Sequence, residues 1–322
     1  MPTPPVSPAY SSINRAYNSV FRPGKLSLGL VVPIEANRNN PVPTMAQHLE
    51  RVQLAERLGF AAVWLRDVPF NVPSFGDAGQ LFDPFVYLGL LAGQTERIAL
   101  GVASIVLPLR HPAHVAKAAA TADVLSGGRL LLGVASGDRP DEYPALNLPF
   151  ENRGARFRDS FDYIRRMSET APEFANAYGQ PGRGMDMLPK PVGGQLPLLI
   201  TGGSQQAPEW AAAHGDGWML YPRPPATQAQ LIRNWNDRVI DAGRSPQPVM
   251  QSLYVDLLDD PDAAPRPIHL GLQTGVRYLI EHLQALEAAG INHVALNLRF
   301  NQTPIEQTLQ QLADALLPQF HS

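Results

Sequence analysis

Short apolar segments alternate with longer segments of helical periodicity over most of this 322-residue chain. A short apolar run bounded by turn residues is typical of a strand that is buried on both faces. Eight such runs occur, at residues 26–32, 61–67, 98–107, 129–136, 196–202, 216–221, 248–258 and 291–300. This pattern favours a parallel sheet that is covered by helices.

The segments between these runs have apolar residues at helical spacing. We expect Thr44 to cap the first helix and Gly59 to end it, because these residue types satisfy the free backbone groups at helix ends. The expected helices are residues 44–59, 83–95, 111–128, 155–167, 205–215, 227–243, 274–290 and 304–317. Eight strand–helix pairs predict an α/β fold, a closed (β/α)₈ TIM barrel, since an open doubly wound sheet usually has fewer strands. No Gly-x-Gly-x-x-Gly follows the first strand, so a dinucleotide-binding fold loses its main support.

Residues 25–322 are therefore predicted to form a single barrel, with two additions. Residues 1–24 are rich in Pro, Ser, Tyr and Asn. They are either a partly ordered tail or an N-terminal arm that packs on the barrel bottom or on a partner subunit. Residues 168–195 contain many Gly and Pro and form an insertion before strand five. We expect it on the catalytic side, as a lid or a wall of the pocket.

Composition excludes several classes of function. The net charge of −3 lacks the positive field that binding to nucleic acid requires. The absence of cysteine excludes disulfides, thiolate metal sites and a cysteine nucleophile, and it is compatible with a cytoplasmic location. No apolar run approaches the roughly 20 residues of a membrane span, and we expect no secretory signal at the N-terminus.

In a barrel of this kind, chemistry is carried by residues at the carboxyl ends of the strands. Polar residues at the predicted ends are Glu35, Arg66, Asp67, Ser104, Arg110, His111, Ser136, Asp138, Arg139, Asp141, Tyr143, Thr201, Ser204, Tyr221, Arg223, Asn297 and Arg299. For some of them a structural role competes with a chemical one. The alternatives are an ion pair at the rim for Arg66 and Asp67, a helix cap for His111 and a solvated loop for residues 135–143.

Other enzyme classes find less support in these residues. His111 and His114 are three apart, but no third metal ligand is obvious. There is no Gly-x-Ser-x-Gly nucleophile motif. A glycoside hydrolase needs two suitably placed carboxylates, and Glu35, Asp67 and Asp138 leave that class open on chemical grounds.

The segment TGGSQQ (201–206) is the most specific local feature. A predicted strand is followed by two glycines, then by Ser204 and then by a predicted helix. Glycine lets the backbone approach a ligand closely, and a helix N-terminus offers free N–H groups, which together suit a phosphate. The alternative is an ordinary turn in which Ser204 caps the helix.

Two longer stretches resemble a known family. GVASIVLPLRHPAHVAKAAATADVLSGGRLLLGVASG (101–137) resembles the signature stretch of the bacterial luciferase-like flavin oxidoreductases. PLLITGGSQQAPEWAAAHGDGW (197–218) is similar to the phosphate-binding strand and helix of that family. The resemblance covers nearly the whole chain from Leu26. The segments RDVPF, SFGDAGQLFDP and LPLRHP make it most similar to a subgroup of luciferase-type oxidoreductases of unknown substrate.

The resemblance implies a non-covalently bound flavin. This would be FMN supplied in reduced form or, in some branches, the deazaflavin F420. It also implies a cis peptide bond between Ala103 and Ser104, under the flavin ring. The cofactor-binding residues that it implies are Ala103, Ser104, Ser136, Gly137, Gly202, Gly203, Ser204 and Gln205. No metal site is expected.

The sequence departs from the family at two positions. Luciferases have a catalytic histidine after strand two, within Glu-His-His, where this chain has Arg66, Asp67 and Val68. Asp67 keeps a carboxylate at the position of the family's glutamate. The family's reactive cysteine on strand four is replaced by Ala135. A light-emitting reaction is therefore not expected.

The expected function is that of a flavin-dependent monooxygenase, which uses reduced FMN and O₂ on a small organic substrate. The alternatives are an F420-dependent dehydrogenase and a flavin-binding protein without turnover. Candidate catalytic residues are Asp67, Arg66, His111, Arg110 and Arg139. Because adjacent strand residues point to opposite faces, we expect Asp67 to face the pocket and Arg66 to brace the outside.

Two partners are also expected. A separate flavin reductase would supply the reduced cofactor. The alanine-rich helix AHVAKAAATADVL (113–125) would permit close approach of another helix, and with the resemblance it predicts a homodimer. The alternative is that these alanines pack on the barrel wall.

Overall fold

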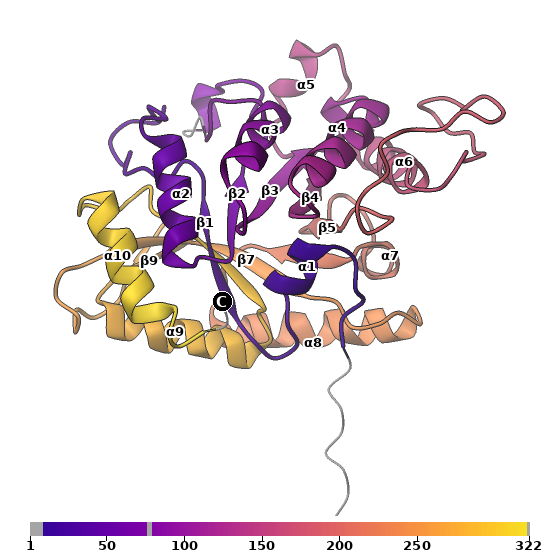
Figure 1. Ribbon diagram of the computed structural model, residues 1–322. Helices are drawn as coiled ribbons and strands as arrows, with labels where there is room; N and C mark the ends of the chain where they lie inside the picture. Colours follow the sequence, from indigo (N-terminus) through magenta and orange to yellow (C-terminus); the bar gives the residue numbers. More distant parts are fainter. Residues whose placement is uncertain (1–8, 76–78, 321–322) are drawn as a thin grey trace, which may run out of the picture.

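The computed structural model describes residues 9–75 and 79–320. Within them, parallel strands surround one interior: β1 (Ser27–Val31), β2 (Ala62–Leu65), β3 (Ala99–Val106), β4 (Leu130–Ala135), β5 (Leu198–Thr201), β6 (Gly217–Leu220), β7 (Val249–Leu257) and β10 (His293–Asn297). Strand β10 pairs with both β7 and β1, which closes the barrel (Figure 1). The predicted (β/α)₈ barrel is confirmed.

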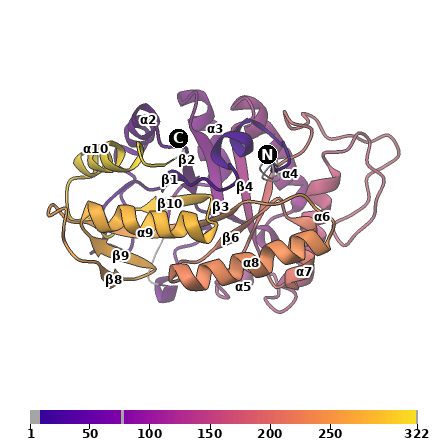
Figure 2. The ribbon, with the colours of Figure 1, turned by 90° about the horizontal axis from the view of Figure 1, so that it is seen from below.

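Helices cover the outside of the barrel. They are α2 (His48–Leu58), α3 (Pro84–Gln94), α4 (Pro112–Leu125), α6 (Arg153–Arg166), α7 (Pro208–His214), α8 (Pro225–Asp241), α9 (Val276–Ala289) and α10 (Ile305–Leu316). Figure 2 shows α8 and α9 side by side on this outer layer. Each helix buries an apolar stripe against the outward-facing side chains of the strands, as an amphipathic helix must in a two-layer fold.

Two helix starts differ from the prediction. Gly59 ends α2 as expected, with a φ of 99° that favours glycine. Thr44 does not cap α2, however, because its backbone N–H donates to the carboxylate of Glu35 and the helix begins four residues later, at His48. Helix α7 begins at Pro208 rather than at residue 205, so a turn separates Ser204 from the helix.

The barrel interior is filled by large side chains that face glycines. A Cβ atom on Gly101 would lie 2.3 Å from the ring of Trp64, and one on Gly29 would lie 2.7 Å from Nε2 of His293. The indole N–H of Trp64 donates to Nε2 of His293 at 2.8 Å, and Nδ1 of His293 contacts Oγ of Ser27 at 2.7 Å. Burial lowers the pKa of His293 to about 3, so the ring is neutral and both nitrogens have a partner.

The described part of the N-terminal arm packs against the amino ends of the strands, which form the barrel bottom. Helix α1 (Arg15–Val20) lies in front of the strands in Figure 1. The hydroxyl of Tyr17 donates to the carbonyl of Asp216 at 2.6 Å, and the amide of Asn14 donates to Asp123 at 2.9 Å. Residues 1–8 of the arm lie outside the described residues.

The insertion at 168–195 lies beside α4 and α6, on the outside of the barrel (Figure 1, in pink). The backbone N–H of Val192 donates to Asp123 at the end of α4, and Gly193 packs against the carbonyl of Ile13 in the arm. At the other end of α4, Tyr178 contacts the ring of His111. The insertion therefore runs along the outside of the barrel from the bottom to the start of α4, and its expected role as a lid or a wall of the pocket stays a prediction.

A hairpin that was not predicted extends the sheet at β7. Strand β8 (Arg266–Ile268) pairs antiparallel with β9 (Gly271–Thr274), and β9 pairs parallel with the end of β7. This pairing places Gln273 beside Asp256. Among the described residues, no helix is both long and apolar enough to cross a membrane.

Candidate active site

Two neighbouring charged residues directly after β2 point in opposite directions. Trp64 belongs to the interior cluster and Leu65 to the outer one, so Arg66 continues the inward face and Asp67 the outward face. The carboxylate of Asp67 accepts from the backbone N–H of Val106 at 3.1 Å and lies between β2 and β3. The expected orientation, with Asp67 facing the pocket and Arg66 outside, was therefore wrong.

Asp67 forms a two-pronged ion pair with Arg110. Its two oxygens accept from Nε and Nη2 of Arg110 at 3.1 and 2.7 Å. The same guanidinium reaches Asp83, the N-cap of α3, at 2.9 Å. Burial opposes the charge on Arg110, but the two carboxylates raise its pKa above the ordinary value. Arg110 thus ties β2, β3 and α3 together, so the ion pair at the rim joins Asp67 to Arg110 and not to Arg66.

His111 has the structural role that competed with the catalytic one. It is the N-cap of α4, and its Nδ1 accepts from the backbone N–H of Ala113 at 3.2 Å. Its ring is exposed and contacts Tyr178 and Tyr163 from outside the barrel. A cap of this kind satisfies one free N–H donor at the start of the helix, which explains the position of His111 without a catalytic role.

Small polar side chains line the mouth of the barrel. Oγ of Ser104 and Oγ1 of Thr201 form a hydrogen bond across it, and Sδ of Met219 lies 3.8 and 3.4 Å from these atoms. The peptide bond between Ala103 and Ser104 is cis, as the resemblance implied. These residues come from β3, β5 and β6, so three strands supply this part of the mouth.

The charge of Arg66 acts on the hydroxyl of Tyr221. Burial raises the pKa of Tyr221, the charge of Asp138 adds to this effect, and the charge of Arg66 opposes it. Arg66 follows β2, Asp138 follows β4 and Tyr221 follows β6, so all three lie at the carboxyl ends of strands.

The turn after β5 presents free backbone donors. Ser204 and Gln205 have φ values of 43° and 59°, and Gly202 has 54°. Among the described residues, nothing accepts a hydrogen bond from the N–H groups of Gly203, Ser204 or Gln205. Oγ of Ser204 donates to the carbonyl of Thr201 at 2.7 Å, so Ser204 closes the turn and does not cap α7. Successive free N–H groups in a left-handed turn form a concave site for an anion.

The N-terminus of α6 packs against this turn. A Cβ atom on Gly154 would lie 2.9 Å from Cβ of Gln205, so only glycine lets the two segments approach this closely. The first turns of α6 also carry Arg153, Arg156 and Arg158, which make no ion pair with any residue that the structure describes. Nε of Arg153 is buried without a hydrogen-bond partner. The N-cap residue of α6 makes no side-chain capping bond either.

Ser136 and Gly137 are joined to this region by Tyr143. The hydroxyl of Tyr143 donates to the carbonyl of Ser136, and a Cβ on Gly137 would lie 3.0 Å from that hydroxyl. Arg153 acts electrostatically on Tyr143, whose pKa burial raises to about 12. The turn after β5, the end of β4 and the start of α6 thus lie together and are here called the anion cradle (residues 136–137, 153–158 and 202–205). The guanidinium groups donate to Phe150, Pro108 and Gln206 but to no carboxylate that the structure describes, so their positive charge adds to the free N–H groups of the turn and suits a phosphate.

Glu142 is a candidate that the sequence analysis missed. It begins the short helix α5 (Glu142–Ala145), its exposed fraction is 2%, and its Oε1 has no hydrogen-bond partner. Nη1 of Arg139 lies 4.0 Å away, and the guanidinium of Arg139 stacks on Phe75. Burial raises the pKa of Glu142 to about 7, Arg139 opposes this and Asp67 adds to it. In the sequence Glu142 is one of several acidic residues in a polar loop, and only the fold reveals its burial.

The carboxylates that could have served a glycoside hydrolase are engaged elsewhere. Glu35 accepts from the backbone N–H groups of Thr44 and Met45 at 2.9 and 3.0 Å, which closes the loop after β1. Asp67 is held by Arg110. The pair of free carboxylates on which that alternative depended is therefore not formed by these residues.

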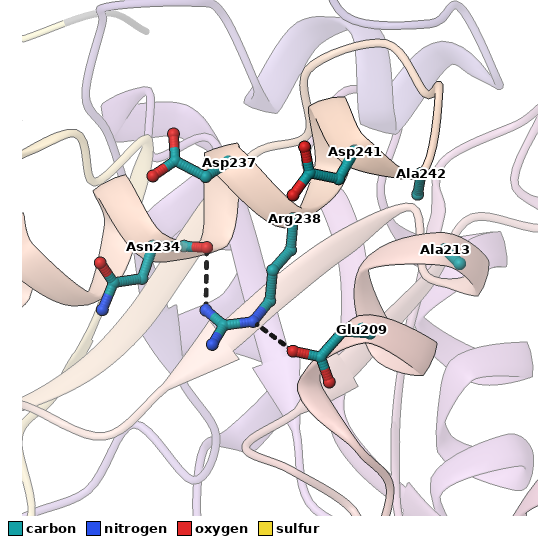
Figure 3. Close-up of a pocket in the computed structure, with 7 residues that line it drawn as sticks. All are labelled: Glu209, Ala213, Asn234, Asp237, Arg238, Asp241 and Ala242. Carbon is teal, nitrogen blue, oxygen red and sulfur yellow. Dashed lines mark hydrogen bonds and ion pairs between the residues drawn. The ribbon is translucent and has the colours of Figure 1, made fainter.

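One groove lies away from the strand ends. It has a volume of about 760 Å³ and runs between α7 and α8 in the outer layer (Figure 3). Arg238 lies in it and pairs with Glu209 at 2.9 Å, with Asp237 and Asp241 nearby. These side chains belong to the outer helices, and none of them comes from the barrel mouth.

The chain belongs to the luciferase-like monooxygenase family, whose model matches residues 26–272. An uncharacterized protein of Mycobacterium tuberculosis is 30% identical over 237 residues, which cover 68% of this chain and 82% of that protein. Two solved structures share the fold. An F420-dependent secondary alcohol dehydrogenase in complex with an F420–acetone adduct has a TM-score of 0.74 at 19% identity, covering 91% and 98% of the two chains. The oxygenating constituent of 3,6-diketocamphane monooxygenase of Pseudomonas putida, in complex with FMN, has a TM-score of 0.73 at 16% identity, covering 92% and 99%.

Proposed function

We propose that this protein is a flavin-dependent monooxygenase that acts on a small organic substrate with reduced FMN and O₂. The observation that carries the proposal is the anion cradle, since unpaired arginines, free N–H groups and glycines at close approach suit the phosphate of a flavin. The cradle is assembled from residues 136–137 and 202–205, which the family resemblance names as cofactor-binding. Membership of the family supports an oxidoreductase.

The residues of the mouth would then divide into two groups. Ala103 and Ser104 would support the flavin ring, while Arg66 and Tyr221 would contact the substrate. Asp67 and Arg110 would act as positioning residues, because their ion pair fixes the strand ends that carry Arg66 and Ser104. When bound, reduced flavin supplies the reducing equivalents for reaction with O₂, and the barrel holds the reactants and excludes bulk water.

The cofactor proposal is tested by comparing FMN with riboflavin, which has the same ring but no phosphate. We expect the purified protein to bind FMN at least tenfold more tightly than riboflavin in a fluorescence titration, because only FMN fills the cradle. Equal affinities would show that the cradle does not bind the phosphate.

An F420-dependent dehydrogenase is the second candidate. It is favoured by the three arginines at the start of α6, whose combined charge exceeds that of one phosphate, and by the F420-binding neighbour. A titration with F420 separates the two candidates, since an F420 enzyme would bind the deazaflavin more tightly than FMN. Oxygen uptake with reduced FMN in excess of the uncatalysed rate would separate a monooxygenase from a flavin-binding protein without turnover.

We further propose a cytoplasmic homodimer that is served by a separate flavin reductase. The alanines of α4 do not provide the interface, because Ala116, Ala119 and Ala120 are buried on the barrel wall. The neighbouring helix α3 instead presents Val86 and Leu90 to solvent, with exposed fractions of 76% and 42%. Light scattering should give twice the chain mass of 35.1 kDa, and a Val86→Lys substitution should return the monomer mass.

A further inference from the structure

Asp123, near the end of α4, is a fully buried carboxylate that holds two segments from distant parts of the sequence. Its Oδ1 accepts from Nδ2 of Asn14 in the N-terminal arm at 2.9 Å. Its Oδ2 accepts from the backbone N–H of Val192 in the insertion, also at 2.9 Å. The exposed fraction of Asp123 is 0%, so both hydrogen bonds lie away from water. Each oxygen of one buried carboxylate therefore fixes a different segment.

The arm is fixed to the turn between α4 and β4 by further hydrogen bonds. Nδ2 of Asn14 also donates to the carbonyl of Leu130 at 2.8 Å, and the backbone N–H of Ala16 donates to the carbonyl of Gly128 at 2.9 Å. Oδ1 of Asn14 accepts from the backbone N–H of Tyr17 at 2.9 Å, which caps α1. A single buried side chain thus starts helix α1 and also holds it on the barrel.

The insertion rests directly on the arm. A Cβ atom on Gly193 would lie 1.6 Å from the carbonyl oxygen of Ile13, so only glycine allows this approach of the two backbones. A Cβ atom on Gly128 would lie 3.4 Å from Cγ1 of Val192 and 3.5 Å from Cβ of Arg15. The arm, the insertion and the turn after α4 therefore meet at one place, and a shift of the arm must change the packing of the insertion.

The arm also closes the lower end of the barrel interior. Tyr17 and Phe21 belong to the same buried cluster as Trp64, which fills the interior. The rings of Phe21 and His293 have centroids 6.2 Å apart. Departure of the arm would therefore expose the interior side chains to water from below.

We propose that Asp123 joins residues 13–17 and residues 191–194 into one cooperative unit, here called the bottom strap, which closes the lower end of the barrel. If either segment leaves, one buried oxygen of Asp123 loses its donor, and this unsatisfied charge weakens the contact with the other segment. The two segments therefore open together, and they open more readily than the whole barrel unfolds. The strap involves no ligand, so it is independent of the proposed function.

Hydrogen exchange of the full-length protein, followed by mass spectrometry, tests the strap. Asn14→Ala removes the arm's side-chain bonds to Asp123 and Leu130 and changes no atom of the insertion. We expect exchange to rise at least tenfold in a peptide covering residues 13–21 and also in one covering residues 190–196. Peptides from β3 and α9 should change less than twofold. Ser12→Ala is the matched control in the arm, because exposed Ser12 only accepts from Asn18, and it should leave residues 190–196 unchanged.

A variant in the insertion tests the same coupling in the opposite direction. Gly193→Ala pushes a methyl group against the carbonyl of Ile13, so we expect exchange in residues 13–21 to rise at least fivefold. Gly182→Ala is the matched control within the insertion, because its Cβ would meet only Cε of Met185 at 3.8 Å, and it should change the arm less than twofold.

Three results would overturn the proposal. The first is an increase in Asn14→Ala that is confined to the arm, with residues 190–196 at the wild-type rate. The second is an arm that exchanges at the wild-type rate in Gly193→Ala. The third is an equal increase in β3 and α9, which would mean that the two segments open only when the whole barrel unfolds.

Discussion

The two ends of the barrel satisfy their buried polar groups to different degrees. At the bottom, Tyr17, Ser27 and His293 are buried and each has a hydrogen-bond partner within the chain. At the top, Oε1 of Glu142 and Oδ1 of Asp256 are equally buried, and neither has a hydrogen-bond partner. The three residues at the bottom are satisfied within the chain, whereas these two carboxylates at the top are not.

The difference indicates which end is built for stability and which for binding. Buried polar groups in folded proteins are almost always hydrogen-bonded, and exceptions tend to lie at functional sites. Arg153, whose buried Nε also lacks a partner, extends the exceptions to the anion cradle. Substitutions at the bottom should therefore change stability and leave ligand affinity alone, whereas those at the top should affect ligand affinity or the pH dependence of stability.

The largest effect should come from the barrel interior. Trp64→Ala leaves a cavity opposite Gly101 and removes the donor to His293, so we expect the free energy of unfolding to fall by about 3–5 kcal/mol. Urea unfolding measures the change, and FMN affinity at low urea should stay within a few-fold. Tyr278→Ala, at a half-exposed ring on α9, should cost less than about 1 kcal/mol in the same assay. A loss below 1 kcal/mol in Trp64→Ala would mean that the interior does not hold the barrel together.

The fold could be predicted because each strand and each helix of the barrel has a local pattern of apolar residues. Each strand is an apolar run between turn residues, and each helix has an apolar stripe, so order and type follow from neighbouring residues. The hairpin β8–β9 was missed because Arg266 and Pro267 lack this pattern and the pairing depends on β7. The path of the insertion along α4 could not be predicted, because its contacts, such as Val192 with Asp123, connect distant segments.

The candidate site could be predicted only in part. Gly202, Gly203 and Ser204 were identified because glycines directly after a strand let the backbone approach a ligand closely, which can be recognised from neighbouring residues alone. Glu142 was missed because its burial depends on side chains from other strands and loops. The directions of the Arg66 and Asp67 side chains were predicted wrongly. The prediction followed the family's glutamate at the position of Asp67, whereas the alternation of strand residues from Trp64 onward directs Arg66 inward.

The next largest effect concerns Glu142 and depends on pH. Its pKa is raised to about 7 from an ordinary value of 4.5, so the folded protein keeps a proton that the unfolded chain loses. Stability should therefore fall as pH rises from about 4.5 to about 7, by roughly 3 kcal/mol in full. Glu142→Gln mimics the protonated acid, so it should match wild type at pH 4 and exceed its stability by up to about 3 kcal/mol at pH 8.

Urea unfolding at pH 4, 6 and 8 measures this effect. Asp141→Asn is the matched control, because Asp141 is the exposed neighbour of Glu142 and only accepts from Ser74. It should change stability by less than about 0.5 kcal/mol at each pH. Equal stability of wild type and Glu142→Gln at pH 8 would show that the carboxylate ionises without penalty.

A smaller effect should separate Asp67 from Arg66. Asp67→Asn removes the charge that holds Arg110 and should lower stability by about 2 kcal/mol, since hydrogen bonds between charged groups are worth more than neutral ones. Arg66→Met should lower stability less than Asp67→Asn does, and it should lower the rate of oxygen uptake with reduced FMN. Thermal unfolding of both variants decides the matter, and a larger loss in Arg66→Met would restore the opposite assignment.

The smallest effect should be at the anion cradle, and it should appear only in binding. Ser204→Asp places a negative charge beside the free N–H groups of Gly203 and Gln205, so FMN affinity should fall at least tenfold, which is about 1.4 kcal/mol. Ser204→Ala removes only the hydrogen bond to Thr201 and should change FMN affinity by less than threefold. Riboflavin, which has no phosphate, should bind wild type and Ser204→Asp equally well. If Ser204→Asp weakens riboflavin as much as FMN, the substitution has distorted the turn; if it weakens neither, the phosphate binds elsewhere.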